Sequence, residues 1–368
     1  MRTHHLDHNA TTPVDERVLE CFVAVERDCP ANPGSLHAPG RRARAVVEDA
    51  RARIAAALRC AVDDVFFTSG GTESNNLAVR GLGDPSLPVL CAELEHPSVL
   101  VPAQQRGTLL WGVGPDGRAI VAAPAGPVGL VAVVHGQNEV GTLQDVASAA
   151  ELAAGLGVPL HVDAAQTLGR VDLAPVVAVA HSVSLSPHKC GGLRGIGVLL
   201  ARGGGAGLRP LLLGGGQEHG LRPGTQSAAL CASAARCTEL AVAEQAVRAR
   251  AMAAARDAFL AALAGTGVAH RVLTPAASLP NTLMVHFPGV DGRTLLPALD
   301  LAGIHASQGS ACSSGSPTPP RVLTAMGMEA EAARACVRFS FAARHEIVGA
   351  EDAGTTTGRA VLKLQRKS

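Results

Sequence analysis

The chain has 368 residues, of which 47% are hydrophobic but only 2% are aromatic, and it has no tyrosine, so its core must be built from Ala, Val and Leu. Such a core suits parallel strands covered by helices better than an aromatic-rich barrel. The formal charge is only +1 at pH 7 and no basic run occurs, which disfavours nucleic-acid binding as the main activity.

The N-terminal stretch MRTHHLDHNATTP has no apolar segment that could serve as a signal peptide. No uninterrupted apolar stretch approaches the roughly 18 residues that cross a bilayer, so we expect no membrane association. The nine cysteines include no CxxC pair, which argues against a disulfide framework or a zinc site. Together these features predict a protein of the reducing cytoplasm without a bound metal.

Helical and strand patterns alternate from residue 40 to residue 200. Residues 40–58 predict an amphipathic helix, residues 63–82 a strand, a glycine turn and a helix, and residues 144–157 another helix. The further strand candidates are residues 87–93, 129–136, 158–164, 181–186 and 195–202. This βαβ alternation predicts an α/β fold with a mostly parallel sheet and helices on both faces.

A second, smaller α/β unit is predicted after an Ala-rich helical tract at about residues 226–264. Residues 280–341 again alternate strand and helix patterns. We therefore expect a large domain at residues 14–250, and a small domain made of residues 1–13 and 251–368.

Polar side chains follow five of the predicted strands, and ligands of open parallel sheets bind at the carboxyl ends of strands. Gly71 and Thr72 follow the first strand, where the N–H groups of a helix start suit a phosphate, although a plain tight turn fits the segment equally well. The polar residues after the other strands are His96, Asn138, Asp163 with Gln166, and Ser186 with His188 and Lys189.

This set matches the needs of pyridoxal phosphate (PLP), whose aldehyde forms a Schiff base with a lysine and whose pyridine nitrogen needs a carboxylate. Apart from Lys189, the chain has only Lys363 and Lys367, and otherwise uses arginine as its long cation. A guanidinium is never deprotonated in proteins and cannot be the nucleophile. We therefore predict that Lys189 is the cofactor lysine rather than a surface cation.

A second reactive group, Cys312, lies in the segment 304–322. Nine of the twelve residues from Gly309 to Pro320 are Gly, Ser or Pro. A cysteine in so polar a loop is predicted to be exposed, mobile and used. Cys190 is a rival thiol, but it follows Lys189 directly and is expected to point away from the cofactor ring.

With these residues the sequence resembles the cysteine desulfurases, fold type I PLP enzymes grouped with the class V aminotransferases. The resemblance covers about residues 4–345 through nine collinear segments: LDHNATTPVDERV, NPGSLHAPGRRAR, VFFTSGGTESNNLAVRG, HGQNEVGTLQDV, HVDAAQTLGRVD, SLSPHKCGGLRGIGVL, GLRPGT, SQGSACSSG and VRFSF. The SACSSG loop is similar to the long-loop branch, typified by the iron–sulfur-cluster and nitrogenase-associated enzymes. The resemblance implies the fold type I transferase fold, with a mostly parallel seven-stranded sheet in the large domain.

The resemblance also implies a role for each matched residue. Lys189 would hold the cofactor aldehyde and later move the Cα proton, while Cys312 would take the sulfur of L-cysteine as a persulfide and leave L-alanine. Around the ring, Asp163 would pair with the pyridine nitrogen, and His96 would stack on the ring and transfer protons. Gln166 and Asn138 would contact the phenolic oxygen, and Arg338 and Asn138 would bind the substrate carboxylate. The implied phosphate ligands are Gly71, Thr72, Ser186 and His188, with Thr225 from the partner subunit.

The resemblance further implies a homodimer that passes sulfur to an acceptor protein. Two departures from the family are Cys190 directly after the lysine and Arg194 where a lysine is usual. The C-terminal AEDAGTTTGRAVLKLQRKS also departs from the family, so the acceptor stays open among iron–sulfur assembly, tRNA thiolation, DNA phosphorothioation and a sulfur-containing natural product.

Other functions fit parts of the same pattern. A selenocysteine lyase or another C–S lyase would use the same scaffold without needing Cys312, and a class V aminotransferase would have no use for the loop. A cysteine-dependent hydrolase would use Cys312 with a histidine base and no PLP. A scaffold that only binds a carrier protein would leave Lys189 and Asp163 unexplained.

Overall fold

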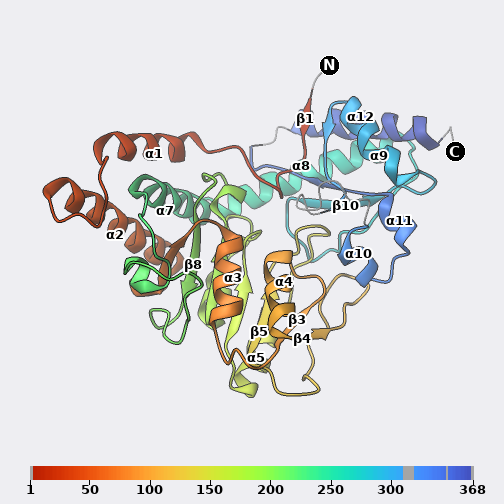
Figure 1. Cartoon of the computed structure of the whole chain (residues 1–368). Coiled ribbons are helices and arrows are strands. Elements are labelled where there is room, and N and C mark those ends of the chain that lie inside the picture. The colour runs from red at the N-terminus through yellow and green to blue at the C-terminus, as the bar shows by residue number, and fades with distance from the viewer. Residues whose placement is uncertain (1–2, 310–318, 345–346, 366–368) are drawn as a thin grey trace.

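The computed structural model describes residues 3–309, 319–344 and 347–365. These residues form a large sheet covered by helices on both faces, and beside it a smaller unit of helices and short strands (Figure 1). The α/β fold with a mostly parallel seven-stranded sheet, predicted from the sequence, is confirmed.

The large sheet has six strands that run in one direction and one that runs against them. In spatial order its strands are β2 (Val65–Thr68), β8 (Gly197–Ala201), β7 (Ser182–Leu185), β6 (Leu160–Asp163), β5 (Leu130–Val134), β3 (Val89–Ala92) and β4 (Thr108–Trp111). Only β8 is antiparallel to its neighbours. The carboxyl ends of the other strands therefore meet at one edge of the sheet.

Helices cover both faces of this sheet, and most of its strand residues are therefore buried. One face packs against α2 (Ala38–Leu58), α5 (Val146–Leu156), α6 (Ala174–Val179) and α7 (Ala228–Ala243). The opposite face packs against α3 (Gly71–Gly81) and α4 (Pro97–Arg106). Helix α1 (Glu16–Asp28) packs on α7 through Val18 and Leu240. The short 3₁₀ helices are η1 (Val62–Asp64), η2 (Pro187–Lys189) and η3 (Gln217–Gly220).

The smaller unit has its own core, in which the rings of Phe259 and Phe339 lie 4.6 Å apart. Its elements are α8 (Gln245–Gly265), β9 (Arg271–Val272), β10 (Thr282–His286), α9 (Gly292–Leu301), β11 (Ile304–His305), α10 (Arg321–Ala325), α11 (Ala330–Arg334), β12 (Cys336–Ser340) and α12 (Ile347–Gln365). The N-terminal strand β1 (His4–His5) pairs in parallel with β11, and Leu6 lies in this core. The domain boundaries at residues 13 and 250 stay a prediction.

Among the helices in the described part of the chain, none is long and apolar enough to cross a membrane.

Candidate active site

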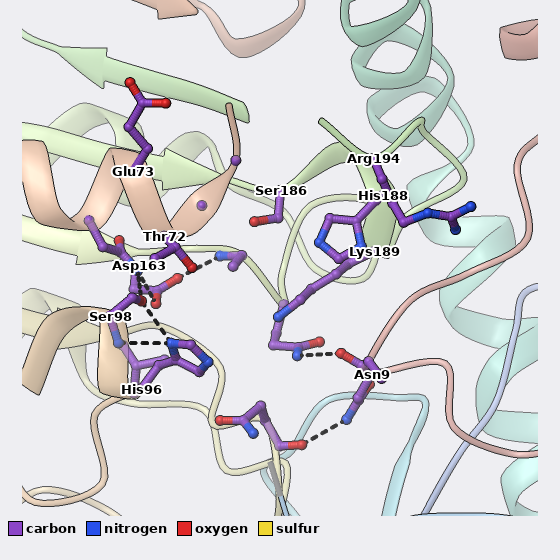
Figure 2. A pocket seen from close by; sticks show the side chains of 18 of the residues that line it. Asn9, Thr72, Glu73, His96, Ser98, Asp163, Ser186, His188, Lys189 and Arg194 are labelled. Atoms are coloured by element: carbon purple, nitrogen blue, oxygen red, sulfur yellow. Dashed lines mark hydrogen bonds between the residues drawn. The ribbon is translucent and has the colours of Figure 1, made fainter. Parts of the chain in front are cut away.

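A cavity of about 390 Å³ lies at the carboxyl edge of the large sheet. Ten of the twelve candidate residues from the sequence line it: Gly71, Thr72, His96, Asn138, Asp163, Gln166, Ser186, His188, Lys189 and Arg338. Figure 2 shows the Lys189 side chain extending from the side of His188 toward Asp163 and His96. The parallel direction of the strands brings these residues together although they are far apart in the sequence.

One end of the cavity is formed by the start of α3 and the turn after β7. A side chain at Gly71 would collide with the Ser186 hydroxyl, so glycine keeps space open at the N-terminus of this helix. The exposed N–H groups and positive end of a helix attract anions. Burial, together with the charges of Lys189 and Arg194, lowers the pKa of His188 to about 4. This end therefore offers neutral and cationic donors that suit a phosphate.

Asp163 ends β6 and is buried in the floor of the cavity. Its Oδ1 accepts a hydrogen bond from the backbone N–H of Ala165 at 2.9 Å, and its Oδ2 accepts one from the side-chain amide of Asn75 at 2.8 Å. These two donors fix the position and the orientation of the buried carboxylate. Asp163 can therefore stabilise a positive charge in the cavity.

Asn75 orients this carboxylate from α3, one helical turn after Gly71. Its Oδ1 lies 3.0 Å from His161 Nε2 and accepts a hydrogen bond from the Ser184 hydroxyl at 2.5 Å. These contacts fix which way the Asn75 amide points, because its oxygen faces His161 and its NH₂ faces Asp163. Burial lowers the pKa of His161 to about 4, so His161 is neutral and donates its Nε2 proton to Asn75.

His96 is the N-cap of α4, and its ring is held in one tautomer. Its Nδ1 accepts a hydrogen bond from the backbone N–H of Ser98 at 3.1 Å and lies 2.7 Å from the Ser98 hydroxyl. A neutral ring must therefore carry its proton on Nε2. Burial lowers the pKa of His96, the charge of Lys189 lowers it further, and Asp163 opposes both effects.

Arg338 reaches the cavity from β12 and is almost fully buried. One terminal nitrogen donates to Asp7 at 2.5 Å and the other to the carbonyl of Asn138 at 2.9 Å. Its Nε has no hydrogen-bond partner among the described residues. A buried donor without a partner is costly, so a ligand acceptor in the cavity would be stabilised by it.

A polar network joins the N-terminal segment to the turn after β6. Asn9 donates from its side-chain amide to the carbonyl of Asn138 at 3.1 Å, and its own carbonyl accepts from the Gln166 amide at 2.9 Å. Arg170 donates to the Gln166 side-chain oxygen, and also to the carbonyl of Lys189 at 3.0 Å. Gln166 and Lys189 are therefore held by the same guanidinium.

The two remaining candidates do not line the cavity in this chain. Thr225 lies exposed between η3 and α7. Cys312 lies outside the described residues, so its position relative to Lys189 stays a prediction. No cluster of His, Cys, Asp or Glu that could hold a metal ion occurs within residues 3–309, 319–344 and 347–365.

Several cavity residues were not singled out from the sequence: Asn9, Glu73, Asn75 and Ser98. Asn75 carried a usable signal, because it follows Gly71 by one helical turn and must lie on the same face of the helix. Asn9 carried none, since its place depends on the N-terminal segment crossing the sheet edge.

Comparisons with known proteins agree with one another over nearly the whole chain. The aminotransferase class-V family model matches residues 4–349. Cysteine desulfurase IscS of Dictyoglomus turgidum is 32% identical over 353 residues, which cover 92% of this chain and 89% of that protein. A solved NifS-like protein has a TM-score of 0.87 at 30% identity and is covered over 100% of its length by 99% of this chain. The structure of SspA in complex with cysteine has a TM-score of 0.79 at 28% identity, over 92% of this chain and 99% of that one.

Proposed function

The chain belongs to the aminotransferase class-V family, and we infer that it is a cysteine desulfurase, which removes sulfur from L-cysteine and leaves L-alanine. Relatives named as cysteine desulfurases match it over about nine-tenths of its length. The observation that carries the inference is that Lys189 and the buried carboxylate of Asp163 line one cavity at the carboxyl edge of the sheet.

The cavity fits PLP, which we propose as the cofactor. The space kept open by Gly71 and Ser186 suits the phosphate, and the doubly hydrogen-bonded Asp163 suits a protonated ring nitrogen. We propose that Thr72 and His188 complete the phosphate site. His96 would stack on the ring, Gln166 and Asn138 would contact its phenolic oxygen, and Lys189 would bind its aldehyde. When bound, PLP supplies a sink for the electrons released at the substrate Cα.

The chain's own residues supply the binding and proton transfer. Arg338 would bind the substrate carboxylate, with its unpartnered Nε as one donor. The Lys189 amine would accept the Cα proton, since it is the only lysine among the residues lining the cavity. His96 can exchange a proton because its lowered pKa keeps the ring neutral near pH 7. The carboxylate of Asp163 would pair with positive charge in the ring pocket.

We propose that Cys312 takes the sulfur as a persulfide and delivers it to an acceptor protein. Its segment lies between β11, which precedes it, and α10, which follows it. The polar sequence of this segment suits a carrier that must reach first the substrate and then the acceptor. The four possible destinations of the sulfur stay open.

We also propose a homodimer in which Thr225 completes the partner's phosphate site. Thr225 is exposed in its own chain and does not line the cavity there. An exposed threonine close to Arg222, whose guanidinium pairs with Glu73 of the cavity wall at 3.0 Å, is well placed to serve a neighbouring copy.

The test is to incubate the protein with L-cysteine and a reductant and to measure sulfide and alanine. Lys189→Ala should lose both products, while Lys363→Ala, which changes an exposed lysine in α12, should lose neither. Cys312→Ala should lose sulfide release, with Cys60→Ala as the thiol control because burial raises the pKa of Cys60 to about 11. Full activity of Lys189→Ala would refute the assignment. Activity that survives in Cys312→Ala would favour a selenocysteine lyase or another C–S lyase.

A further inference from the structure

A second cavity, of about 450 Å³, also has Lys189 in its wall. Lys189 lines both cavities, whereas Cys190 lines only the second. The walls of this second cavity include Arg170, Arg248 and Met252. Nothing in the proposed reaction uses this space, so the exposure of Cys190 to it calls for a separate explanation.

Cys190 has a partner thiol in Cys237 of α7. Their sulfur atoms lie 3.4 Å apart, although the residues are 47 positions apart in the sequence. A disulfide needs about 2.05 Å between the sulfurs, so the two must approach by only about 1.4 Å. Both thiols lie near the carbonyl oxygen of Pro187, at 3.2 and 3.6 Å, and so face the same point. Cys237 is buried and Cys190 is partly exposed, so reagents reach Cys190 first.

The surroundings of the two cysteines shift their pKa values in opposite directions, which makes Cys190 the nucleophile and Cys237 the second thiol. The hydrogen bond between the two thiols lowers the pKa of Cys190, burial opposes this, and the charges of Arg248 and Arg170 lower it further. The pKa of Cys237 is raised by the same hydrogen bond and by burial. Elsewhere burial alone dominates and raises the pKa of Cys91 and Cys231. Reactivity toward oxidants follows thiolate character and access, and both favour Cys190.

We propose that Cys190 and Cys237 form a redox modification site, at which a small peroxide that enters the second cavity produces a reversible disulfide. The Cys190 thiolate attacks the peroxide, the O–O bond breaks, and Cys190 becomes a sulfenic acid while hydroxide leaves. The Cys237 sulfur then attacks the Cys190 sulfur, so that the S–S bond forms and the S–O bond breaks. Two thiols lose two electrons and two protons in total, and hydrogen peroxide becomes two molecules of water.

The disulfide would also disturb Lys189, and this part of the inference rests on the proposed function. The carbonyl of Lys189 is held by Arg170 at 3.0 Å and that of Cys190 by Arg248 at 2.9 Å. Drawing the Cys190 sulfur toward α7 pulls on this anchored turn. A catalytic group misplaced by 1 Å can cost about 10²-fold in rate, so we expect reaction at Lys189 to slow by about 10- to 100-fold.

The disulfide can be read directly by mass spectrometry. The holoenzyme is treated with hydrogen peroxide, alkylated and digested with trypsin without reductant. Cleavage after Lys189 and Arg236 gives the peptides CGGLR and CTELAVAEQAVR, each with its cysteine in first position. We expect them to be linked, and to separate after dithiothreitol. Cys231→Ala, which changes another buried cysteine of α7, should leave the linked pair intact, whereas Cys237→Ala and Cys237→Ser should both abolish it. Recovery of separate peptides from the oxidised wild type would overturn the proposal.

The effect on Lys189 is measured in Cys312→Ala, where the loop thiol cannot interfere. The readout is the rate at which the cofactor absorbance changes on rapid mixing with L-cysteine, before and after peroxide. We expect a 10- to 100-fold slower change after oxidation, reversed by dithiothreitol and absent when Cys237→Ala is added. If peroxide slowed the absorbance change equally with and without Cys237, the proposed effect of the disulfide on Lys189 would be refuted. Absence of any cofactor absorbance in the reduced protein would refute the proposed function instead, and the peptide result would be unaffected.

Discussion

The buried ion pair between Arg51 and Glu218 is expected to be a main support of the loop that carries Thr225. Arg51 lies in α2 and Glu218 in η3, and both are only 4% exposed. Their side chains form two hydrogen bonds, of 2.8 and 3.0 Å. Glu218 also accepts from the backbone N–H of Phe67 at 2.9 Å and from the Gln226 amide, next to Thr225. One carboxylate thus ties the loop to a helix and to the sheet.

Replacing Glu218 by glutamine should be strongly destabilising. The guanidinium of Arg51 would stay buried with only the exposed carboxylate of Glu48, at 3.1 Å, as its ionic partner. Removing one member of a buried pair costs about 3–5 kcal/mol, because the other charge is left uncompensated. Glutamine can still accept one hydrogen bond, so we expect a loss of about 3 kcal/mol. Glu218 also has a φ of 50°, and this left-handed backbone persists only while its side-chain contacts hold it.

The assay is urea unfolding followed by circular dichroism at fixed protein and PLP concentrations. The matched control is Arg53→Met, two residues further along α2. Arg53 pairs with Glu239 at similar distances, 2.7 and 2.8 Å, but both side chains are about 30% exposed. An ion pair so open to solvent is worth about 0–1 kcal/mol. The double variant Arg51→Met with Glu218→Gln should lose less than the sum of the single losses, by about 1–3 kcal/mol. Equal losses for Glu218→Gln and Arg53→Met would refute the reasoning.

Three further predictions concern the cavity and the residues that support it. Asn75→Ala removes the 2.8 Å donor to Asp163, a charge-assisted bond of about 1.5–3 kcal/mol, so PLP affinity measured by absorbance titration should fall about 10- to 100-fold. Arg80→Ala, at an exposed position in the last turn of the same helix, should change that affinity less than twofold. Arg338→Lys should raise KM for L-cysteine about tenfold or more, with a smaller change in kcat, because a lysine cannot form a bidentate contact with the substrate carboxylate. An unchanged KM in steady-state assays would contradict this role. The pKa of His161 is lowered to about 4, so below pH 6.5 the unfolded chain binds a proton that the folded chain does not. The free energy of unfolding should therefore fall by on the order of 3 kcal/mol as the pH drops from about 6.5 to about 4. Unfolding titrations at several pH values measure this, and His161→Gln should give a flatter profile.

Many cavity residues could be predicted from the sequence because they lie shortly after strands of the mostly parallel sheet. Asp163 and Ser186 directly follow the apolar runs of β6 and β7, and parallel strands deliver whatever follows them to one edge. The short edge strand β4 was not predicted, since its residues Thr108 and Leu109 are only half-buried and lack a clear pattern. Helix α4 was also missed, because Pro97 and Pro102 break its periodicity.

Contacts between distant segments could not be predicted. His161 was read only as part of a strand, yet its ring lies against Asn75 of α3, 86 residues earlier in the chain. Its place two residues before Asp163 on β6 puts both side chains on the same face of the sheet, which is the only local hint of their relation. Which helix then covers that face depends on the packing of the whole domain.

The arrangement around Lys189 explains why one lysine is kept among so many arginines. In its proposed role, residue 189 needs a side chain that can lose its proton. The carbonyls of Lys189 and Cys190, in contrast, are held by fixed guanidinium donors. Arg170 and Arg248 are suited to that second task because a guanidinium stays charged and offers several donors in a plane. Arg248 and Arg170 also lower the pKa of Cys190, so the two arginines that hold the backbone of residues 189 and 190 would make Cys190 sensitive to oxidation. A disulfide at Cys190 would therefore act on the backbone that these arginines fix, without entering the substrate cavity.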